Sequence, residues 1–241
     1  MEKEYILVID SGLGGVTILK SLMQKLSGES FIYLADNLNS PYGNKSKKFL
    51  QQNIINLLTK VFSQYKIKLV VFACNTLTAT TINKVRKHFN VKFVGTEPAI
   101  KQVSLNEKTL VLATEQTHKN CKILKKYKNN KNFDFLEIKN VASFLDKNFF
   151  NREKIIYELA NQIKNKSYKN VVLGCTHYYF LENEIKVVLN NENIKFFKSI
   201  KGVVNRVTSL VENNKNEQEY KIMLTKEDKL LSSTIEFLLK F

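Results

Sequence analysis

Hydrophobic residues fall into short runs that alternate with longer amphipathic stretches. Runs of consecutive apolar residues suit strands buried on both faces of a parallel sheet. They predict strands at Tyr5–Ile9, Phe31–Leu34, Leu69–Ala73, Val91–Val94, Thr109–Ala113, Phe133–Ile138, Val171–Gly174 and Lys195–Phe197. Helical spacing predicts helices at Val16–Leu26, Arg152–Ile163 and around Leu50, Ile54, Leu57, Leu58, Val61 and Phe62. The alternation predicts an α/β fold whose mainly parallel sheets are covered by helices on both faces.

The strand pattern is repeated along the chain. Leu7-Val8-Ile9-Asp10-Ser11 resembles Leu110-Val111-Leu112-Ala113-Thr114, and Val70-Val71-Phe72-Ala73-Cys74 resembles Val171-Val172-Leu173-Gly174-Cys175, both shifted by about 100 residues. We therefore expect two pseudo-symmetric lobes with a cleft between them. Residues 1–96 and 206–241 would form the first lobe, with Cys74, and residues 97–205 the second, with Cys175. Val211–Glu219 is expected to be a loop, and Lys226–Leu239 a final helix of the first lobe.

Composition places the chain among folded proteins, with 44% hydrophobic and 25% charged residues. No stretch reaches the roughly 20 apolar residues that span a bilayer, and we expect no signal peptide and no membrane partner. Three widely spaced cysteines then predict free thiols in the cytoplasm. The net charge of +16 raises nucleic acid as a partner. The lysines are spread along the whole chain, however, so we expect a solvated surface instead.

Two of the three cysteines, Cys74 and Cys175, close apolar strands. Ligands of open parallel sheets bind beyond the carboxyl ends of the strands. The small polar residues after each cysteine can cap a helix or offer N–H groups to an anion. Two thiols facing each other across a cleft suit racemisation, because a thiol can serve as a general base near neutral pH. A cysteine beside His177 that attacks an acyl group is the alternative.

Other patterns are less informative. Cys121 lies within a helical stretch and is expected to be structural. Three cysteines and three histidines raise a zinc site, but no CxxC or HExxH spacing is present, so we expect no metal. Gly12, Gly14 and Gly15 resemble a phosphate-binding loop, yet Thr17 leaves the G-x-G-x-x-G spacing incomplete. A tight turn close to the substrate is favoured.

Four motifs resemble those of the glutamate racemases and occur in that family's order and spacing. They are Asp10-Ser11-Gly12-Leu13-Gly14-Gly15, Pro41-Tyr42-Gly43, Ala73-Cys74-Asn75-Thr76 and Gly174-Cys175-Thr176-His177. Asp36 and Gly95 with Glu97-Pro98 fall where the family has similar turns, and the resemblance covers residues 5–210. It implies two α/β lobes that enclose the substrate. It also implies an enzyme that interconverts L- and D-glutamate without a cofactor, with a product that serves peptidoglycan synthesis.

The resemblance also implies roles for individual residues. Cys74 would take the proton from D-glutamate and Cys175 the proton from L-glutamate, assisted by Asp10 and His177 respectively. The implied substrate-binding set is Asp10, Ser11, Tyr42, Gly43, Asn75, Thr76, Thr117, Thr176 and His177. Glutamate is the expected small-molecule partner, and a homodimer is left open.

Several positions depart from the family's pattern. Ala35 replaces a usual glycine, Tyr179 stands where proline is usual, and Ser143–Asp146 matches poorly a segment with proline and glutamate. Thr114 and Thr117 fit the second-lobe turn only approximately. An aspartate racemase and a catalytically decayed ligand-binding homologue are therefore kept as alternatives, and a basic nucleic-acid-binding protein as a remote one.

Overall fold

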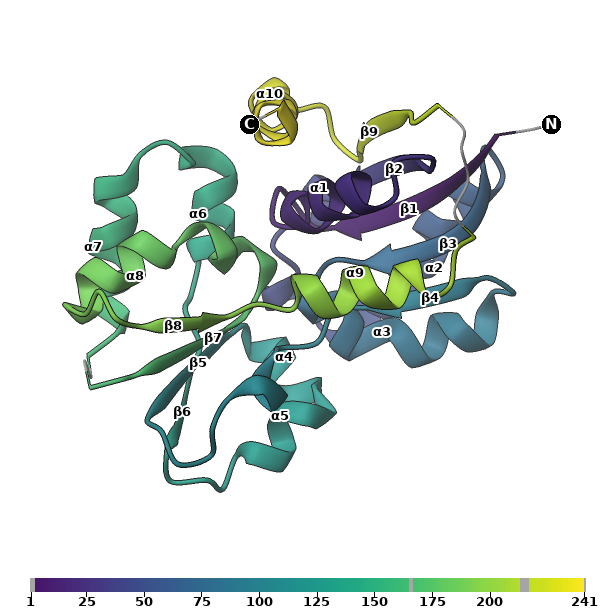
Figure 1. Ribbon diagram of the computed structural model, residues 1–241. Coiled ribbons are helices and arrows are strands. Elements are labelled where there is room, and N and C mark those ends of the chain that lie inside the picture. The colour runs from purple at the N-terminus through teal and green to yellow at the C-terminus, as the bar shows by residue number, and fades with distance from the viewer. Residues whose placement is uncertain (1–2, 165–166, 213–216, 241) are drawn as a thin grey trace.

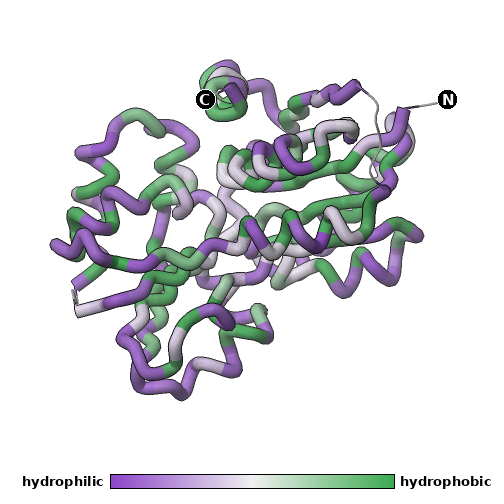
Figure 2. Tube along the Cα trace, viewed as in Figure 1, coloured by the Kyte–Doolittle hydropathy of each residue, from purple (hydrophilic) through white to green (hydrophobic). Residues whose placement is uncertain are grey.

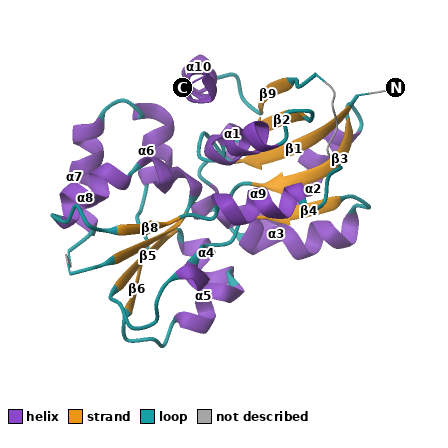
Figure 3. Ribbon diagram, viewed as in Figure 1, coloured by secondary structure: helices purple, strands orange, loops and turns teal. Residues whose placement is uncertain are grey.

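The structure, a computed structural model, describes residues 3–164, 167–212 and 217–240. Two sheets, each accompanied by helices, form two lobes that lie side by side (Figure 1). Figure 3 shows the strands of each lobe between its helices. This arrangement confirms the predicted α/β fold with two lobes.

The first sheet has the spatial order β4-β3-β1-β2-β9, and all of its neighbouring pairs are parallel. Its strands are β1 (Glu4–Asp10), β2 (Ser30–Ala35), β3 (Lys66–Phe72), β4 (Lys92–Gly95) and β9 (Tyr220–Leu224). The sequence predicts the first four. It misses β9, whose residues are exposed or only partly buried, so no continuous apolar run marks it. Pairing with β2 defines this edge strand.

The second sheet repeats the first in its topology. Its order is β6-β5-β7-β8, and all three pairs are parallel. The strands are β5 (Thr109–Ala113), β6 (Phe133–Leu136), β7 (Asn170–Gly174) and β8 (Lys195–Phe197). Read from the opposite edge, the order β8-β7-β5-β6 matches β4-β3-β1-β2. The two sequence repeats therefore correspond to equivalent central strands, β1 with β5 and β3 with β7.

The helices fill the connections between strands. The α-helices are α1 (Val16–Lys25), α2 (Lys47–Phe62), α3 (Asn75–His88), α4 (Glu115–Asn120), α5 (Lys122–Tyr127), α6 (Val141–Asn148), α7 (Arg152–Gln162), α8 (Glu182–Leu189), α9 (Ile200–Thr208) and α10 (Lys229–Lys240). The 3₁₀ helices are η1 (Asn37–Asn39), η2 (Tyr42–Asn44), η3 (Ile100–Gln102) and η4 (Thr176–Phe180). The four predicted helices correspond to α1, α2, α7 and α10. Residues 213–216 of the predicted loop lie outside the described residues.

The strands of the first sheet bury side chains on both faces. Ile6 and Val8 of β1 join the apolar cluster that contains α1, α9 and α10, whereas Leu7 and Ile9 join the cluster that contains α2 and α3. Successive side chains of a strand point to opposite faces, so a strand covered on both sides must be apolar throughout. Figure 2 shows this hydrophobic colour concentrated in the strands.

One apolar cluster joins the two lobes, because it includes residues of β1 and α1 as well as of α6, α7 and α8. Helix α9 packs on α1 and β4, and α10 packs on α1 and α6. The expected division at residues 205 and 206 lies inside α9, and the lobe boundaries stay a prediction. Nowhere in the described ranges is there a helix with the length and apolar character to cross a membrane.

Candidate active site between the lobes

The two predicted thiols occupy equivalent places in the two lobes. Cys74 follows β3 and caps α3, while Cys175 follows β7 and precedes η4. Only 6% of Cys74 and 7% of Cys175 is exposed. Asp10, whose charge raises the pKa of Cys74, accepts a hydrogen bond from Thr176, the residue after Cys175. The structure therefore brings the two thiols together at the junction of the lobes.

The glycine-rich loop after β1 contacts the turn that follows Cys175. Thr176 donates a hydrogen bond of 2.9 Å from Oγ1 to Oδ2 of Asp10, which joins the two lobes. A Cβ atom on Gly14 would lie 2.5 Å from His177 Nδ1 and 2.7 Å from Thr176 Oγ1. No glycine in the described residues has a positive φ. The glycines therefore serve close approach of the lobes rather than an unusual backbone conformation.

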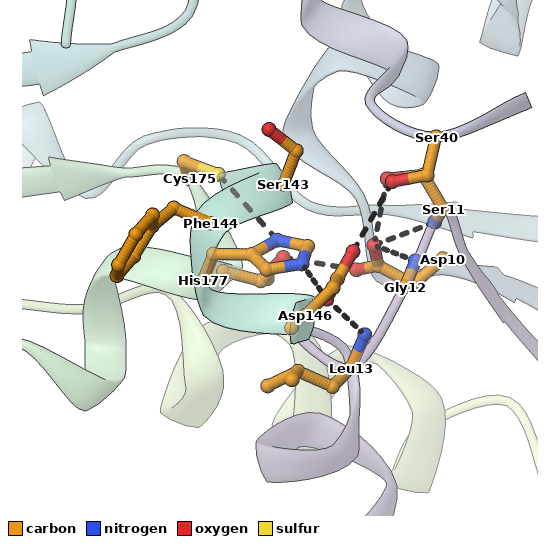
Figure 4. Close-up of polar contacts among 12 residues, drawn as sticks. Asp10, Ser11, Gly12, Leu13, Ser40, Ser143, Phe144, Asp146, Cys175 and His177 are labelled. Carbon is orange, nitrogen blue, oxygen red and sulfur yellow. Dashed lines mark hydrogen bonds and ion pairs between the residues drawn. The ribbon is translucent and has the colours of Figure 1, made fainter. Parts of the chain in front are cut away.

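His177 lies between Cys175 and Asp146, as Figure 4 shows. Its Nδ1 is 3.9 Å from Cys175 Sγ, and its Nε2 is 2.9 Å from Asp146 Oδ1. Asp146, near the end of α6, also accepts from the Leu13 amide at 3.1 Å and from Ser40 Oγ at 3.2 Å. Asp146 thus connects the second-lobe imidazole to two first-lobe loops.

Burial and charge shape the chemistry on the Cys74 side. Burial raises the pKa of Cys74, Asp10 and Cys175 raise it further, and the backbone amides of Leu77 and Thr76 lower it. Burial also raises the pKa of Asp10, against the opposing effects of His177 and of hydrogen bonds from Thr176 and Ser11. A neutral Cys74 thiol is therefore favoured, which is the form that can donate a proton.

An ion pair dominates the Cys175 side. Burial alone would lower the pKa of His177, but the Asp146 carboxylate beside it raises this pKa well above its ordinary value. For Asp146, burial would raise the pKa and the His177 imidazolium lowers it below the usual range. Both groups are therefore charged near neutral pH, and His177 carries a proton next to Cys175.

Three threonine hydroxyls form a second contact across the lobes. Thr76 Oγ1 of α3 lies 2.7 Å from Thr114 Oγ1 and 3.2 Å from Thr117 Oγ1, and the last two are 3.0 Å apart. A Cβ atom on Gly43 would lie 3.0 Å from the Thr114 side chain, so η2 packs against the same turn. The structure brings the predicted residues Thr76, Thr117 and Gly43 together, and it adds Thr114.

Two predicted substrate-binding residues have partners within the protein. The Tyr42 hydroxyl donates a 2.6 Å hydrogen bond to Asp36 Oδ2. Asp36 also accepts from Asn53 Nδ2 at 2.6 Å and from Thr225 Oγ1 at 2.7 Å. Ser11 donates from its amide to Asp10 Oδ1 at 2.6 Å. The Tyr42 hydroxyl thus holds the loop before α2 in place, and its contact with substrate stays a prediction.

Asn75 presents an unused acceptor beside Cys74. Its Nδ2 donates to the Thr96 carbonyl at 3.1 Å, which orients the amide. Its Oδ1 is buried and has no hydrogen-bond partner among the described residues. A buried acceptor without a donor is costly in a folded protein, so this oxygen suits a ligand that brings an N–H or O–H group.

The sequence interpretation misses Asp146 as a site residue and treats its segment only as a poor match to the family. No local pattern marks it, since Asp146 meets His177 only through the packing of α6 on η4. Within the described ranges, no three His, Cys, Asp or Glu side chains are grouped so that they could hold a metal ion.

Comparison with known proteins gives the family. No protein-family model matches the chain. A Bacillus subtilis protein named glutamate racemase 2 is 34% identical over 212 residues, which cover 81% of this chain and 80% of that protein. The crystal structure of glutamate racemase from Campylobacter jejuni matches with a TM-score of 0.83 at 22% identity and covers 98% of each chain, which shows the shared fold. The Francisella tularensis glutamate racemase in complex with D-glutamate has a TM-score of 0.79 at 25% identity, over 100% of this chain and 95% of that one.

The fold, the paired thiols and these relatives define an amino-acid racemase, which is an isomerase. Within this class, the motifs around Asp10, Cys74 and Cys175 lie together at the junction of the two lobes, whose sheets share one strand order. The chain belongs to the glutamate racemase family.

Proposed function

We propose that this protein interconverts L- and D-glutamate by a two-base mechanism in which Cys74 and Cys175 act on opposite faces of the substrate Cα. The pairing of two buried thiols at equivalent strand ends carries this proposal. Each thiol also has its own ionisable neighbour, Asp10 beside Cys74 and His177 beside Cys175. A pseudo-symmetric pair of this kind suits a reaction whose two directions are mirror images.

Each step conserves protons. From L-glutamate, the Cys175 thiolate takes the Cα proton, and the electron pair left on Cα is delocalised into the α-carboxylate. The neutral Cys74 thiol then gives its proton to the opposite face, which leaves D-glutamate and a Cys74 thiolate. From D-glutamate the roles are exchanged. His177 and Asp10 would pass protons to and from the sulfur atoms between turnovers, and general acid–base catalysis of this kind contributes about 10²–10⁴-fold.

The polar groups around the thiols suit an amino acid. Among the described residues, the hydroxyls of Thr76, Thr114 and Thr117 bond to each other and to the Thr117 amide of α4, and a substrate carboxylate could replace these contacts. The free Asn75 Oδ1 could accept from the substrate ammonium group. Because Asp10, Cys74, Cys175 and Thr176 are buried, we propose that the lobes separate to admit the substrate. The similar Francisella tularensis enzyme solved with D-glutamate supports this choice of substrate.

The test is exchange of the glutamate α-proton with D₂O, followed by NMR, together with racemisation followed by circular dichroism. The protein is supplied with EDTA and no added cofactor, and with each enantiomer of glutamate. We expect both activities in the wild type and a loss of at least about 10³-fold in Cys74→Ser and in Cys175→Ser. Cys121→Ala is the matched control, because Cys121 is also buried but lies in a separate apolar cluster.

Absence of α-proton exchange in the folded wild type refutes the proposal. Aspartate is assayed on the same sample, and faster turnover of aspartate would replace glutamate as the substrate. Retention of activity in both single cysteine variants would refute the two-thiol mechanism while leaving the family assignment intact.

The cellular setting is also proposed. We propose a cytoplasmic enzyme that needs no cofactor and supplies D-glutamate for peptidoglycan synthesis, as the family resemblance implies. A homodimer is an open expectation that sedimentation analysis decides. We also propose two lobes, residues 1–96 with 206–241 and residues 97–205. Because α9 packs on α1 and β4, we propose that the whole helix belongs to the first lobe, which moves the second division to just before Ile200.

A further inference from the structure

A chain of aromatic side chains runs from the C-terminal helix to the Cys175 turn. The rings of Phe237 and Phe150 are 5.7 Å apart at an angle of 76°. Phe150 meets Phe149 at 5.3 Å, and Phe149 meets Phe180 at 5.2 Å, both nearly perpendicular. Edge-to-face contacts at these distances are favourable and depend on ring orientation.

The two rings nearest the site, Phe149 and Phe180, lie at the ends of the elements that carry the Asp146–His177 ion pair. Phe149 caps the C-terminal end of α6, just after Asp146, and Phe180 ends η4, which contains His177. Arg152 contacts both Phe149 and Phe180. Its guanidinium lies 4.6 Å from the centre of the Phe149 ring, and its Nη1 donates to the Phe180 carbonyl at 3.2 Å.

The outer member is attached to the first lobe. Helix α10 buries Leu231 and Ile235 in the shared apolar cluster and packs on α1. A cavity of about 200 Å³ separates part of α10 from the end of α6, lined by Asp146, Phe149, Phe150, Leu230 and Thr234 among others. Beside this cavity, the Phe150–Phe237 contact joins α10 to the segment that follows α6.

The exposure of this aromatic pair is high for a purely structural contact. Phe150 is 63% exposed and Phe237 is 44% exposed. Residues this exposed bury little apolar surface, so their removal changes global stability only modestly. What distinguishes the two rings is their position, because they join α10, which packs on the first lobe, to the segment that carries Asp146.

We propose that Phe237 is a positioning residue, through which α10 braces the end of α6 and so holds Asp146 Oδ1 against His177 Nε2 when the lobes are closed. This inference rests on the proposed racemase function and adds to it an element far along the chain from both thiols. In Figure 1 α10 is the yellow helix at the C-terminal end of the chain, over α1.

Loss of the brace has a specific electrostatic consequence. The ionisable groups that face His177 are Asp146 from α6, Cys175 from its own turn and Asp10 from β1. Displacement of α6 moves only Asp146 among these. The His177 pKa would then fall towards its ordinary value, and Cys175 would lose a well-placed proton donor.

The experiment compares Phe237→Ala and Phe150→Ala with the wild type. His177 is titrated by NMR, which is straightforward because the chain has three histidines, and the variant His177→Asn identifies its signal. We expect the His177 pKa to fall by about one unit in each variant and kcat to fall about tenfold, with KM changed less. The effects of the two substitutions should not add in the double variant, because each single variant already removes the Phe150–Phe237 contact.

Two further variants separate positioning from general damage. Phe237→Tyr retains an aromatic ring and should restore both the His177 titration and kcat. Phe49→Ala is the matched control, since Phe49 is 42% exposed and lies on α2, which packs chiefly on α3. It should leave both readouts unchanged.

An unchanged His177 titration in Phe237→Ala and Phe150→Ala overturns the proposal, as does equal loss of activity in Phe49→Ala. If the variants instead alter the oligomeric state in sedimentation and leave the titration unchanged, the aromatic pair is an interface between copies and the proposal is overturned. A wild type without α-proton exchange refutes the proposed function, and the titration still decides the positioning role separately.

Discussion

Replacement of Asp146 by asparagine tests how the site is held together. The side chain keeps its shape, but it can no longer carry the charge that pairs with His177. Asp146 is 12% exposed and His177 2% exposed, so this is a nearly dry ion pair. Removing one partner of a buried pair leaves the other charge uncompensated.

The magnitude follows from this burial. Loss of one partner of a buried pair costs about 3–5 kcal/mol. The asparagine oxygen can still accept from the Leu13 amide, and its NH₂ group can donate to Ser40 Oγ in place of the bond that Asp146 accepts there, so the lower value of about 3 kcal/mol is expected. For a chain of this size each kcal/mol lowers Tm by about 2–4 °C. We therefore expect the Tm of Asp146→Asn to fall by about 6–12 °C at about pH 6.

The effect depends on pH with a defined sign. Because the pKa of His177 is higher in the folded than in the unfolded chain, protonated His177 stabilises the fold. This stabilisation is fully present below the unfolded-state pKa of 6.5 and is lost as the pH rises through the raised pKa. The lowered pKa of Asp146 stabilises above its unfolded value of 3.8, and this contribution is lost as the pH falls through the lowered pKa. The difference between wild type and variant is therefore largest between these limits.

Thermal unfolding of both proteins, followed by circular dichroism from about pH 5 to about pH 10, measures this difference. The gap in Tm should narrow at the alkaline end, where neutral His177 no longer needs a counter-charge. A gap that is absent at about pH 6, or that stays constant over the whole range, would refute the ion-pair argument. Racemisation should fall at least tenfold in parallel, because His177 would lose its proton and orientation.

Other perturbations address single contacts. Gly14→Ala places a Cβ within 2.5 Å of His177 Nδ1, so lobe closure is blocked and kcat/KM should fall about 100-fold or more with little change in Tm; near-normal turnover would contradict this. Thr117→Val removes one hydroxyl of the threonine cluster and should raise the KM for glutamate about tenfold, measured by initial rates. Tyr42→Phe leaves Asp36 without a 2.6 Å donor and should lower stability by about 1–3 kcal/mol in urea unfolding. A large rise in KM for Tyr42→Phe would instead indicate direct contact with substrate.

The contacts across the lobes explain why the glycine-rich loop resembles a phosphate-binding loop without being one. Its residues follow a strand and open a helix, as in nucleotide-binding proteins. Gly12 and Gly14 lie against Asp146 and against the Thr176-His177 turn. The glycines of this loop thus allow the two lobes to pack closely against each other.

Much of the fold follows from the sequence alone. Runs such as Ile6 to Ile9 must be covered on both faces, and this requirement determines parallel sheets between helices. Eight of the nine strands in the described part of the chain follow from such runs, and β9 escapes because it lies at a sheet edge and is only partly buried. Cys74 and Cys175 are identified in the same way, because the chemistry of a parallel sheet gathers at strand ends, which local sequence marks well.

The partners of these residues follow only from tertiary structure. Asp146 faces His177 because α6 packs on η4, and Tyr42 is engaged by Asp36 through the loop before α2. Neither contact has a periodic signal. Asp146 and His177 lie on separate elements of the second lobe, and Tyr42 and Asp36 are close in sequence but are joined by an irregular loop. Local sequence determines which residues end a buried strand, because burial of a strand is a local pattern. Which side chains then meet across the lobes is decided by packing, because hydrogen bonds and ion pairs form only at distances that the folded chain sets.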